Sequence, residues 1–126
     1  MMKLISERTY EEKKSRFIAR MYSLENEEDN KLVLQTLRNG NPDAKHLLHV
    51  SRFENRFKAY TMEASDDREP ISSMKKASRY FERDDIRGMG IFIIRYYGGK
   101  ELGASHLDQV YFKLTMKLFE EYKSMK

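Results

Sequence analysis

One stretch of the chain decides its fold: Met-Gly-Ile-Phe-Ile-Ile-Arg-Tyr-Tyr-Gly-Gly-Lys, residues 89–100. Over residues 89–97 this stretch is apolar or aromatic, interrupted only by Gly90 and Arg95. A run of this length without polar alternation is typical of a strand that a sheet buries on both faces. We therefore predict that residues 89–97 form the most buried strand of the molecule.

Two glycines follow this strand, and an amphipathic pattern follows the glycines. Gly98-Gly99 predicts a tight turn with positive φ at one of the two residues. Replacing either glycine by valine is then expected to lower stability by about 1 kcal/mol or more. From about residue 102 to 122 a final helix is predicted, because its core face recurs at helical spacing: Leu107, Val110, Tyr111, Leu114, Leu118 and Tyr122.

The N-terminal part of the chain predicts extended structure and then a helix. Residues 3–24 read as strand, with the best alternation in their second half. A helix is expected over residues 26–38, with Asn26 as its N-cap and Gly40 as a left-handed stop.

The middle of the chain predicts a hairpin and a short helix. Residues 45–53 and 56–64 are strand-like runs around Glu54-Asn55. A helix then runs from Ser72 or Ser73 to about residue 83. The full order is β, β, α, β, β, α, β, α, which predicts an α+β sandwich of two layers with helices on one face of the sheet.

Length and composition restrict the class of protein. The 126 residues fit a single domain, and an apolar fraction of 40% can form its core. The absence of cysteine excludes disulfides, cysteine-bound zinc and thiol nucleophiles. No apolar run approaches the roughly 20 residues of a membrane span, and the first 20 residues contain no signal-peptide segment. We expect a soluble, cytoplasmic protein that does not contact membranes.

The net charge of +4 is unevenly distributed. Residues 1–70 contain 13 basic and 13 acidic residues, whereas residues 71–126 contain 11 basic and 7 acidic ones. The whole excess therefore lies in the second part of the chain, which favours an acidic partner there.

The glycine turn is a candidate anion site. Free N–H groups at the start of the following helix can bind an anion, and Lys100 and Arg95 would add charge. The spacing matches neither the dinucleotide fingerprint nor a P-loop, so no nucleotide cofactor is expected. The alternative is an ordinary strand-to-helix turn.

A second candidate is the basic row on the short helix. Lys75, Arg79 and Arg83 are spaced four apart, and Lys76 lies beside them. Such a row can contact phosphates, which require charge without strict geometry. The alternative is a plain solvated face.

A third candidate is the acidic run of Asp66, Asp67 and Glu69 before Pro70. Carboxylates can hold Mg²⁺ or act as acid and base, but this spacing specifies neither. The alternative is a solvated loop that caps or pairs with nearby basic residues. We expect the run to point away from the basic row. His46 and His49 lie on opposite faces of a strand, so no metal site is expected.

Four segments, in this order, resemble the YigZ/Impact family. They cover nearly the whole chain, from about residue 11 to 122, and read Lys13-Lys14-Ser15-Arg16-Phe17-Ile18-Ala19, Pro42-Asp43-Ala44-Lys45-His46, Ser65-Asp66-Asp67-Arg68-Glu69-Pro70 and Arg95-Tyr96-Tyr97-Gly98-Gly99-Lys100-Glu101-Leu102-Gly103. The resemblance implies one Impact-type domain over residues 1–126. It also implies the fold of the second domain of ribosomal protein S-five, a mixed four-stranded core sheet with helices on one face.

The resemblance also implies a class of function. Eukaryotic relatives resemble translation regulators that restrain an amino-acid-starvation kinase, and bacterial relatives are usually described as nucleic-acid-binding. The chain departs from the family pattern after the acidic motif, at residues 71–77, and in the first turns of the last helix, at residues 104–111. It also has Arg68 where the family favours glycine.

We therefore expect a non-enzymatic module without catalytic residues, associated with RNA or the ribosome in translation regulation or a stress response. Phosphates would meet the basic side chains, and a tyrosine would stack on an unpaired base. The proposed surface is Lys75, Arg79, Arg83, Arg95, Tyr96, Tyr97, Gly98, Gly99 and Lys100. One alternative is a protein-interaction module that binds a translation or stress factor. Another is an enzyme that uses Asp66, Asp67 and the glycine loop.

Overall fold

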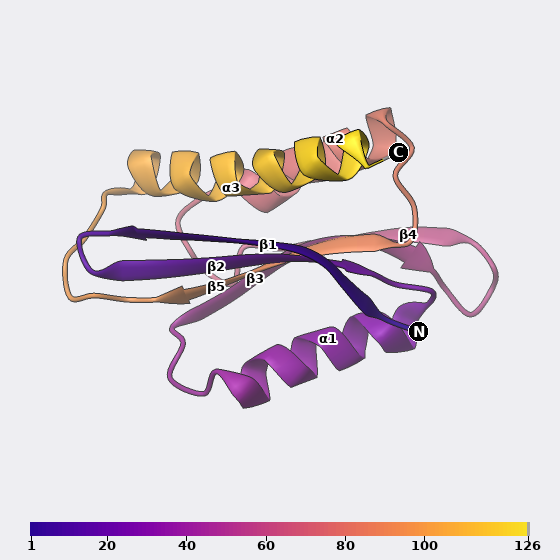
Figure 1. Cartoon of the computed structure of the whole chain (residues 1–126), viewed down its shortest axis with the longest axis horizontal. Coiled ribbons are helices and arrows are strands. Elements are labelled where there is room, and N and C mark those ends of the chain that lie inside the picture. The colour runs from indigo at the N-terminus through magenta and orange to yellow at the C-terminus, as the bar shows by residue number, and fades with distance from the viewer. Residues whose placement is uncertain (126) are drawn as a thin grey trace.

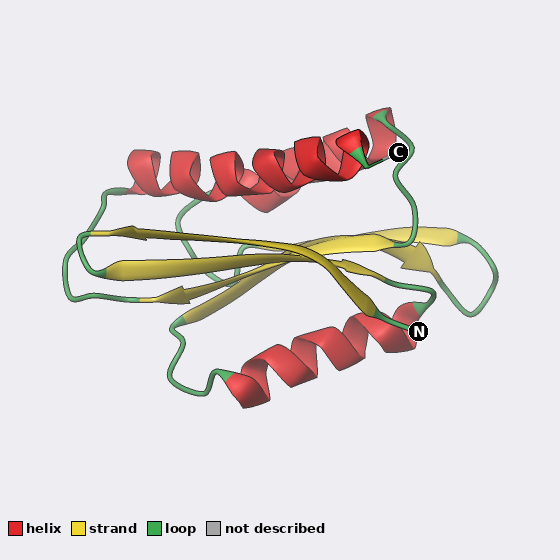
Figure 2. Cartoon of the chain, in the orientation of Figure 1, coloured by secondary structure: helices red, strands yellow, loops and turns green. Residues whose placement is uncertain are grey.

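The computed structural model describes residues 1–125, and their elements follow the predicted order. The chain contains five strands and three helices in the order β, β, α, β, β, α, β, α (Figure 2), which confirms the α+β class. The elements are β1 (Lys3–Glu12), β2 (Ser15–Ser23), α1 (Glu27–Gly40), β3 (His46–Glu54), β4 (Tyr60–Ser65), α2 (Ser73–Arg83), β5 (Met89–Tyr96) and α3 (Ala104–Ser124).

The sheet has the order β1-β2-β5-β3-β4, and all neighbouring strands run antiparallel. Strand β5, the last in sequence, is central, and all its residues except Tyr96 are buried. This confirms the prediction that this strand is the most buried one of the molecule. The resemblance implied a mixed four-stranded sheet, and the structure corrects both points. Strands β2 and β3 run in the same direction through the crossover helix α1, but β5 lies between them and opposes both.

The expectation of helices on one face is wrong. Helices α2 and α3 cover one face of the sheet, and α1 covers the other (Figure 1). The cause lies in β5, where Ile91 and Ile93 face α2 and α3 while Phe92 and Ile94 face α1. A strand that is apolar on both sides needs a cover on each, so the molecule has three layers.

The helix ends show which capping predictions hold. Asn26 accepts a hydrogen bond from the Asp29 N–H and caps α1 as predicted. Gly40 does not adopt a left-handed conformation. Gly40 is the last residue of α1, and the following Asn41 caps the helix, with its side-chain amide donating to the Leu37 carbonyl at 2.9 Å.

The β3–β4 connection is longer than the two residues predicted, because residues 55–59 all belong to it. The Asn55 side chain organises this loop by accepting hydrogen bonds from the N–H groups of Phe57 and Ala59. Strand β4 consequently begins at Tyr60, four residues later than expected. Within residues 1–125, none of the helices combines the length and apolar character of a membrane span.

Candidate nucleic-acid interface

Helix α2 presents the predicted basic row to solvent. Lys75, Arg79 and Arg83 are all exposed on it, while Met74 and Phe81 are buried against the sheet. Among the described residues 1–125, no side chain forms an ion pair or hydrogen bond with that of Arg79. Arg79 is therefore available to a phosphate without first losing a partner.

The structure adds a groove that the sequence did not predict. It has a volume of about 470 Å³ and lies between α2 and α3, lined by Lys76, Arg79, Tyr80, Arg83 and Phe112. The ring centroids of Tyr80 and Phe112 are 5.8 Å apart, and the Arg83 guanidinium lies 4.5 Å from the Tyr80 centroid. Lys75 does not line the groove, so Lys76 replaces it in the basic set that faces α3.

Tyr80 and Phe112 are the residues that the sequence reasoning missed. Tyr80 lies four residues after Lys76 and three before Arg83, so one side of the helix carries all three. That spacing could have placed Tyr80 beside the basic side chains from the sequence alone. No sequence pattern could have placed Phe112 in the groove, because only the packing of α3 beside α2 brings it there.

Ion pairs join the two helices at both ends of α2. Near its start, Lys76 Nζ lies 2.7 Å from Asp108 Oδ2. At its end, Asp84 accepts from Arg83 at 3.0 Å and from Lys123 of α3 at 2.8 Å. Hydrogen bonds from Arg83 and then Lys123 lower the pKa of the Asp84 carboxyl to about 2. Arg83 of the basic row and the adjacent Lys76 are therefore partly neutralised, by Asp84 and Asp108 respectively.

The expectation that the acidic run points away from the basic row is wrong for Asp66, which lies at the start of α2 and interacts electrostatically with Lys75 of that row. Asp66 accepts a hydrogen bond from the Met74 N–H at 3.1 Å and so caps α2, whose N-cap residue Ser72 makes no side-chain capping bond. Partial burial raises the pKa of the Asp66 carboxyl. Asp67 points to β3, where it accepts from the Leu47 N–H at 2.8 Å.

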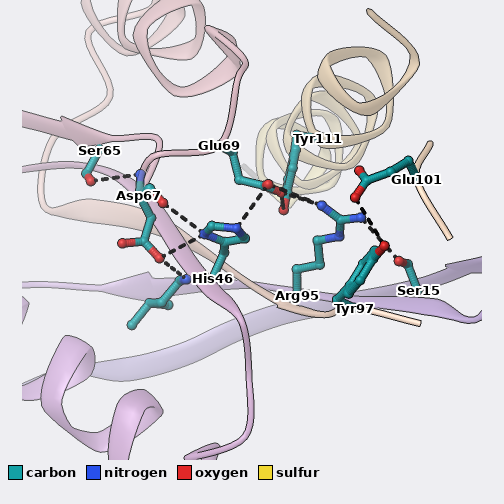
Figure 3. Close-up of polar contacts among 10 residues, drawn as sticks. Ser15, His46, Ser65, Asp67, Glu69, Arg95, Tyr97, Glu101 and Tyr111 are labelled. Atoms are coloured by element: carbon teal, nitrogen blue, oxygen red, sulfur yellow. Dashed lines mark hydrogen bonds and ion pairs between the residues drawn. The ribbon is translucent and has the colours of Figure 1, made fainter. Parts of the chain in front are cut away.

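Arg95 is not a phosphate contact, and this prediction is corrected. It is 3% exposed and lies inside the molecule at the end of β5. Its Nη1 donates to the two carboxylate oxygens of Glu69 at 2.8 and 3.2 Å, and its Nη2 donates to Ser15 Oγ at 3.2 Å (Figure 3). A guanidinium held in this way has no free face for a ligand.

Glu69 is the centre of this buried network. Besides Arg95, the Tyr111 hydroxyl donates to its carboxylate, and His46 Nε2 lies 3.1 Å from it (Figure 3). Burial, followed by the bond to Glu69, raises the pKa of the Tyr111 hydroxyl. The alternative of a loop that caps or pairs with basic residues is confirmed in its contacts, because Asp66 caps α2 and Glu69 pairs with Arg95, but Glu69 is buried rather than solvated.

The buried network explains why the four family-like segments occur together. Ser15 belongs to the first segment, His46 to the second, Glu69 to the third and Arg95 to the fourth. Their side chains meet in one cluster at the end of the sheet. His49 faces α1 instead, stacked on Phe92, so the two histidines lie on opposite faces as predicted.

Tyr96, the last residue of β5, and Tyr97, which follows the strand, point to opposite sides of the sheet and do not form one surface. The Tyr96 hydroxyl donates to Asn41 on the α1 side at 2.6 Å. Tyr97 packs against Arg95 and Lys45, and its hydroxyl donates to Glu101 at 3.1 Å. Neither tyrosine lines the groove between α2 and α3.

The glycine turn confirms the predicted positive φ at one residue, Gly99, whose φ is +92°. Gly98 is constrained by space instead, since a Cβ there would lie 2.2 Å from the backbone carbon of Lys14. Lys100 is exposed beside them. The predicted surface is thus divided between α2 and the end of the sheet.

Comparisons with known proteins place the chain in a family. No curated protein matches it. A crystal structure described as a hypothetical protein has a TM-score of 0.78 and 25% identity, covering 94% of this chain and 60% of that one. The two-domain translational regulator Yih1 has a TM-score of 0.51 and 18% identity, covering 92% of this chain and 46% of that one. The chain thus spans less than two thirds of either structure. The Impact N-terminal domain matches residues 13–119, and because this match includes most of the chain, the protein belongs to the Impact N-terminal domain family.

Proposed function

We propose that the protein is a non-enzymatic binding module that associates with RNA or the ribosome in a role related to translation. The observation that carries this proposal is the basic, aromatic groove between α2 and α3. Lys76, Arg79 and Arg83 supply positive charge along one helix, which suits the regular charge of a phosphate backbone. The likeness of the fold to Yih1, which is described as a translational regulator, supports the link to translation.

The acidic residues support binding rather than catalysis. Asp66 caps α2, Asp67 accepts from the Leu47 N–H, and Glu69 is surrounded by Arg95 and Tyr111. A general base needs a carboxylate within reach of a substrate proton. Each of these three carboxylates already accepts hydrogen bonds within the protein, so the proposal assigns them to structure.

The test is charge reversal on α2. The triple variant Lys75→Glu, Arg79→Glu, Arg83→Glu is expected to lose RNA binding in a filter-binding titration at two salt concentrations, while its circular dichroism melt still shows a folded protein. Wild-type affinity should fall steeply as salt rises, because phosphate contacts release counterions. A matched control, Lys3→Glu, Lys31→Glu, Arg56→Glu, makes the same change in net charge at exposed positions outside the groove.

Two results would contradict the proposal. Unchanged affinity in the folded α2 variant would place the RNA site elsewhere. No affinity in the wild type at low salt would favour the protein-interaction module, for which the exposed Phe57 is the supporting feature. Phe57 is 75% exposed at the tip of the β3–β4 hairpin, in a loop that Asn55 orders. Pull-downs with and without nuclease then separate a partner held through RNA from one held by protein contacts.

A further inference from the structure

We propose that the groove between α2 and α3 is selective for single-stranded RNA, with an unpaired base stacking on Phe112. The inference deepens the proposed function and rests on it. It names which form of RNA the groove binds and assigns the selectivity to an aromatic side chain rather than to the basic row.

Of the two rings, Phe112 is the one placed for stacking, because the Arg83 guanidinium lies over the Tyr80 ring, 4.5 Å from its centroid. Tyr80 and Phe112 are both partly exposed where they line the groove, and their planes are inclined at 54°. They therefore do not cover each other face to face, as a stacked pair would. Base–aromatic stacking tolerates any sequence because every base has a π face, but it requires a base that is not already paired and stacked.

The charges are placed for the backbone of the same strand. Arg83 lies seven residues after Lys76 on α2, which corresponds to about 10 Å along the helix axis. With Arg79 between them, the three cations form a line on α2 along the groove. A groove that combines aromatic rings with a line of cations is the usual arrangement for unpaired nucleic acid.

Buried packing sets the spacing of α2 and α3 before a ligand arrives. Phe81 of α2 and Phe119 of α3 are fully buried, and their ring centroids are 4.8 Å apart. At the surface, ion pairs from Lys76 to Asp108 and from Lys123 to Asp84 also join this pair of helices. A-form duplex RNA is recognised across its shallow minor groove, and its paired bases cannot reach a ring that lies between helices. The duplex should therefore bind through charge alone.

The experiment compares two probes by fluorescence anisotropy: a 12-nucleotide single strand of mixed sequence and the same strand annealed to its complement. The wild type is expected to bind the single strand more tightly. Phe112→Leu should weaken that binding about tenfold and leave duplex affinity unchanged. The slope of affinity against salt should stay the same, because the variant keeps every phosphate contact. Phe57→Leu is the matched control and should change neither affinity.

The outcomes separate this inference from the proposed function. If neither probe binds, the proposed function fails and the inference with it. If both probes bind equally and Phe112→Leu changes nothing, only the inference is overturned. A second measurement needs no variant: a single strand containing 4-thiouridine is irradiated with the wild-type protein, and the crosslinked peptides are mapped. Crosslinks to the peptide of Phe112 are expected, and crosslinks confined to other segments would overturn the inference.

Discussion

At Glu69 a single buried carboxylate joins the acidic loop to β5 through Arg95 and to α3 through Tyr111. Removing its charge would leave the Arg95 guanidinium, 3% exposed, without a counter-ion. Loss of one partner of a buried ion pair costs about 3–5 kcal/mol, because the remaining charge stays desolvated. We therefore predict that Glu69→Gln lowers the free energy of unfolding by about that amount, as measured by urea denaturation.

The control for this prediction is Glu101→Gln. Glu101 also accepts a hydrogen bond from a tyrosine, Tyr97, but it lies at the surface. Its substitution should change stability by no more than about 0.5 kcal/mol. Equal effects of the two substitutions would mean that the Arg95–Glu69 pair does not hold the loop.

For individual residues, the sequence predicted which helical side chains face solvent better than it predicted which side chains pair with each other. Arg79 was correctly placed on a solvent-facing row, because helical spacing assigns a residue to a face. Arg95 was assigned to a phosphate although it pairs with Glu69, 26 residues earlier in the chain. A contact over that separation depends on the arrangement of β5, α3 and the acidic loop, and no local pattern contains it.

At the scale of elements, the turn from β5 to α3 requires glycine at two positions for two different reasons. A Cβ on Gly98 would meet the Lys14 backbone, whereas a Cβ on Gly99 would meet nothing within 4 Å but would require positive φ. We predict that Gly99→Ala costs about 1 kcal/mol, through backbone strain alone. Gly98→Ala should cost more, because the β1–β2 turn must move. Thermal melts measure both, and a smaller loss for Gly98→Ala would contradict the close approach.

The elements themselves were largely predictable, but their layering was not. The continuous apolar run of β5 predicts a buried strand, and the helical spacing of the apolar residues of α3 predicts a helix. The placement of α1 on the opposite face follows from the same both-sided run, but it requires knowing that β5 is inserted between β2 and β3. The groove likewise required α2 and α3 to be neighbours.

At the scale of the whole molecule, the two hydrophobic cores share one strand. Ile91 and Ile93 belong to the core beneath α2 and α3, and Phe92 and Ile94 belong to the core above α1. Opening either core therefore exposes half of β5. We predict that both cores open together, so amide hydrogen exchange from β5 should be the slowest and should report the free energy of global unfolding.

The same measurement has an internal comparison. Amides on the outer edges of β1 and β4, which end the sheet, should exchange faster than those of β5. Exchange of α1 at a distinctly lower free energy than α3 would show that the cores open independently, contrary to the prediction.

The central place of β5 also has a consequence during synthesis. Ser15 and Arg95, which hydrogen-bond in the finished sheet, are 80 residues apart. At about 5–20 residues per second, roughly 4–16 s pass between their appearance in the nascent chain. During that interval the β1–β2 and β3–β4 hairpins have no strand to join them, and the inner edges of β2 and β3 are open to pairing with other chains. Aggregation in the cell should thus depend on how fast residues 16–95 are translated, more than on the stability of the finished protein.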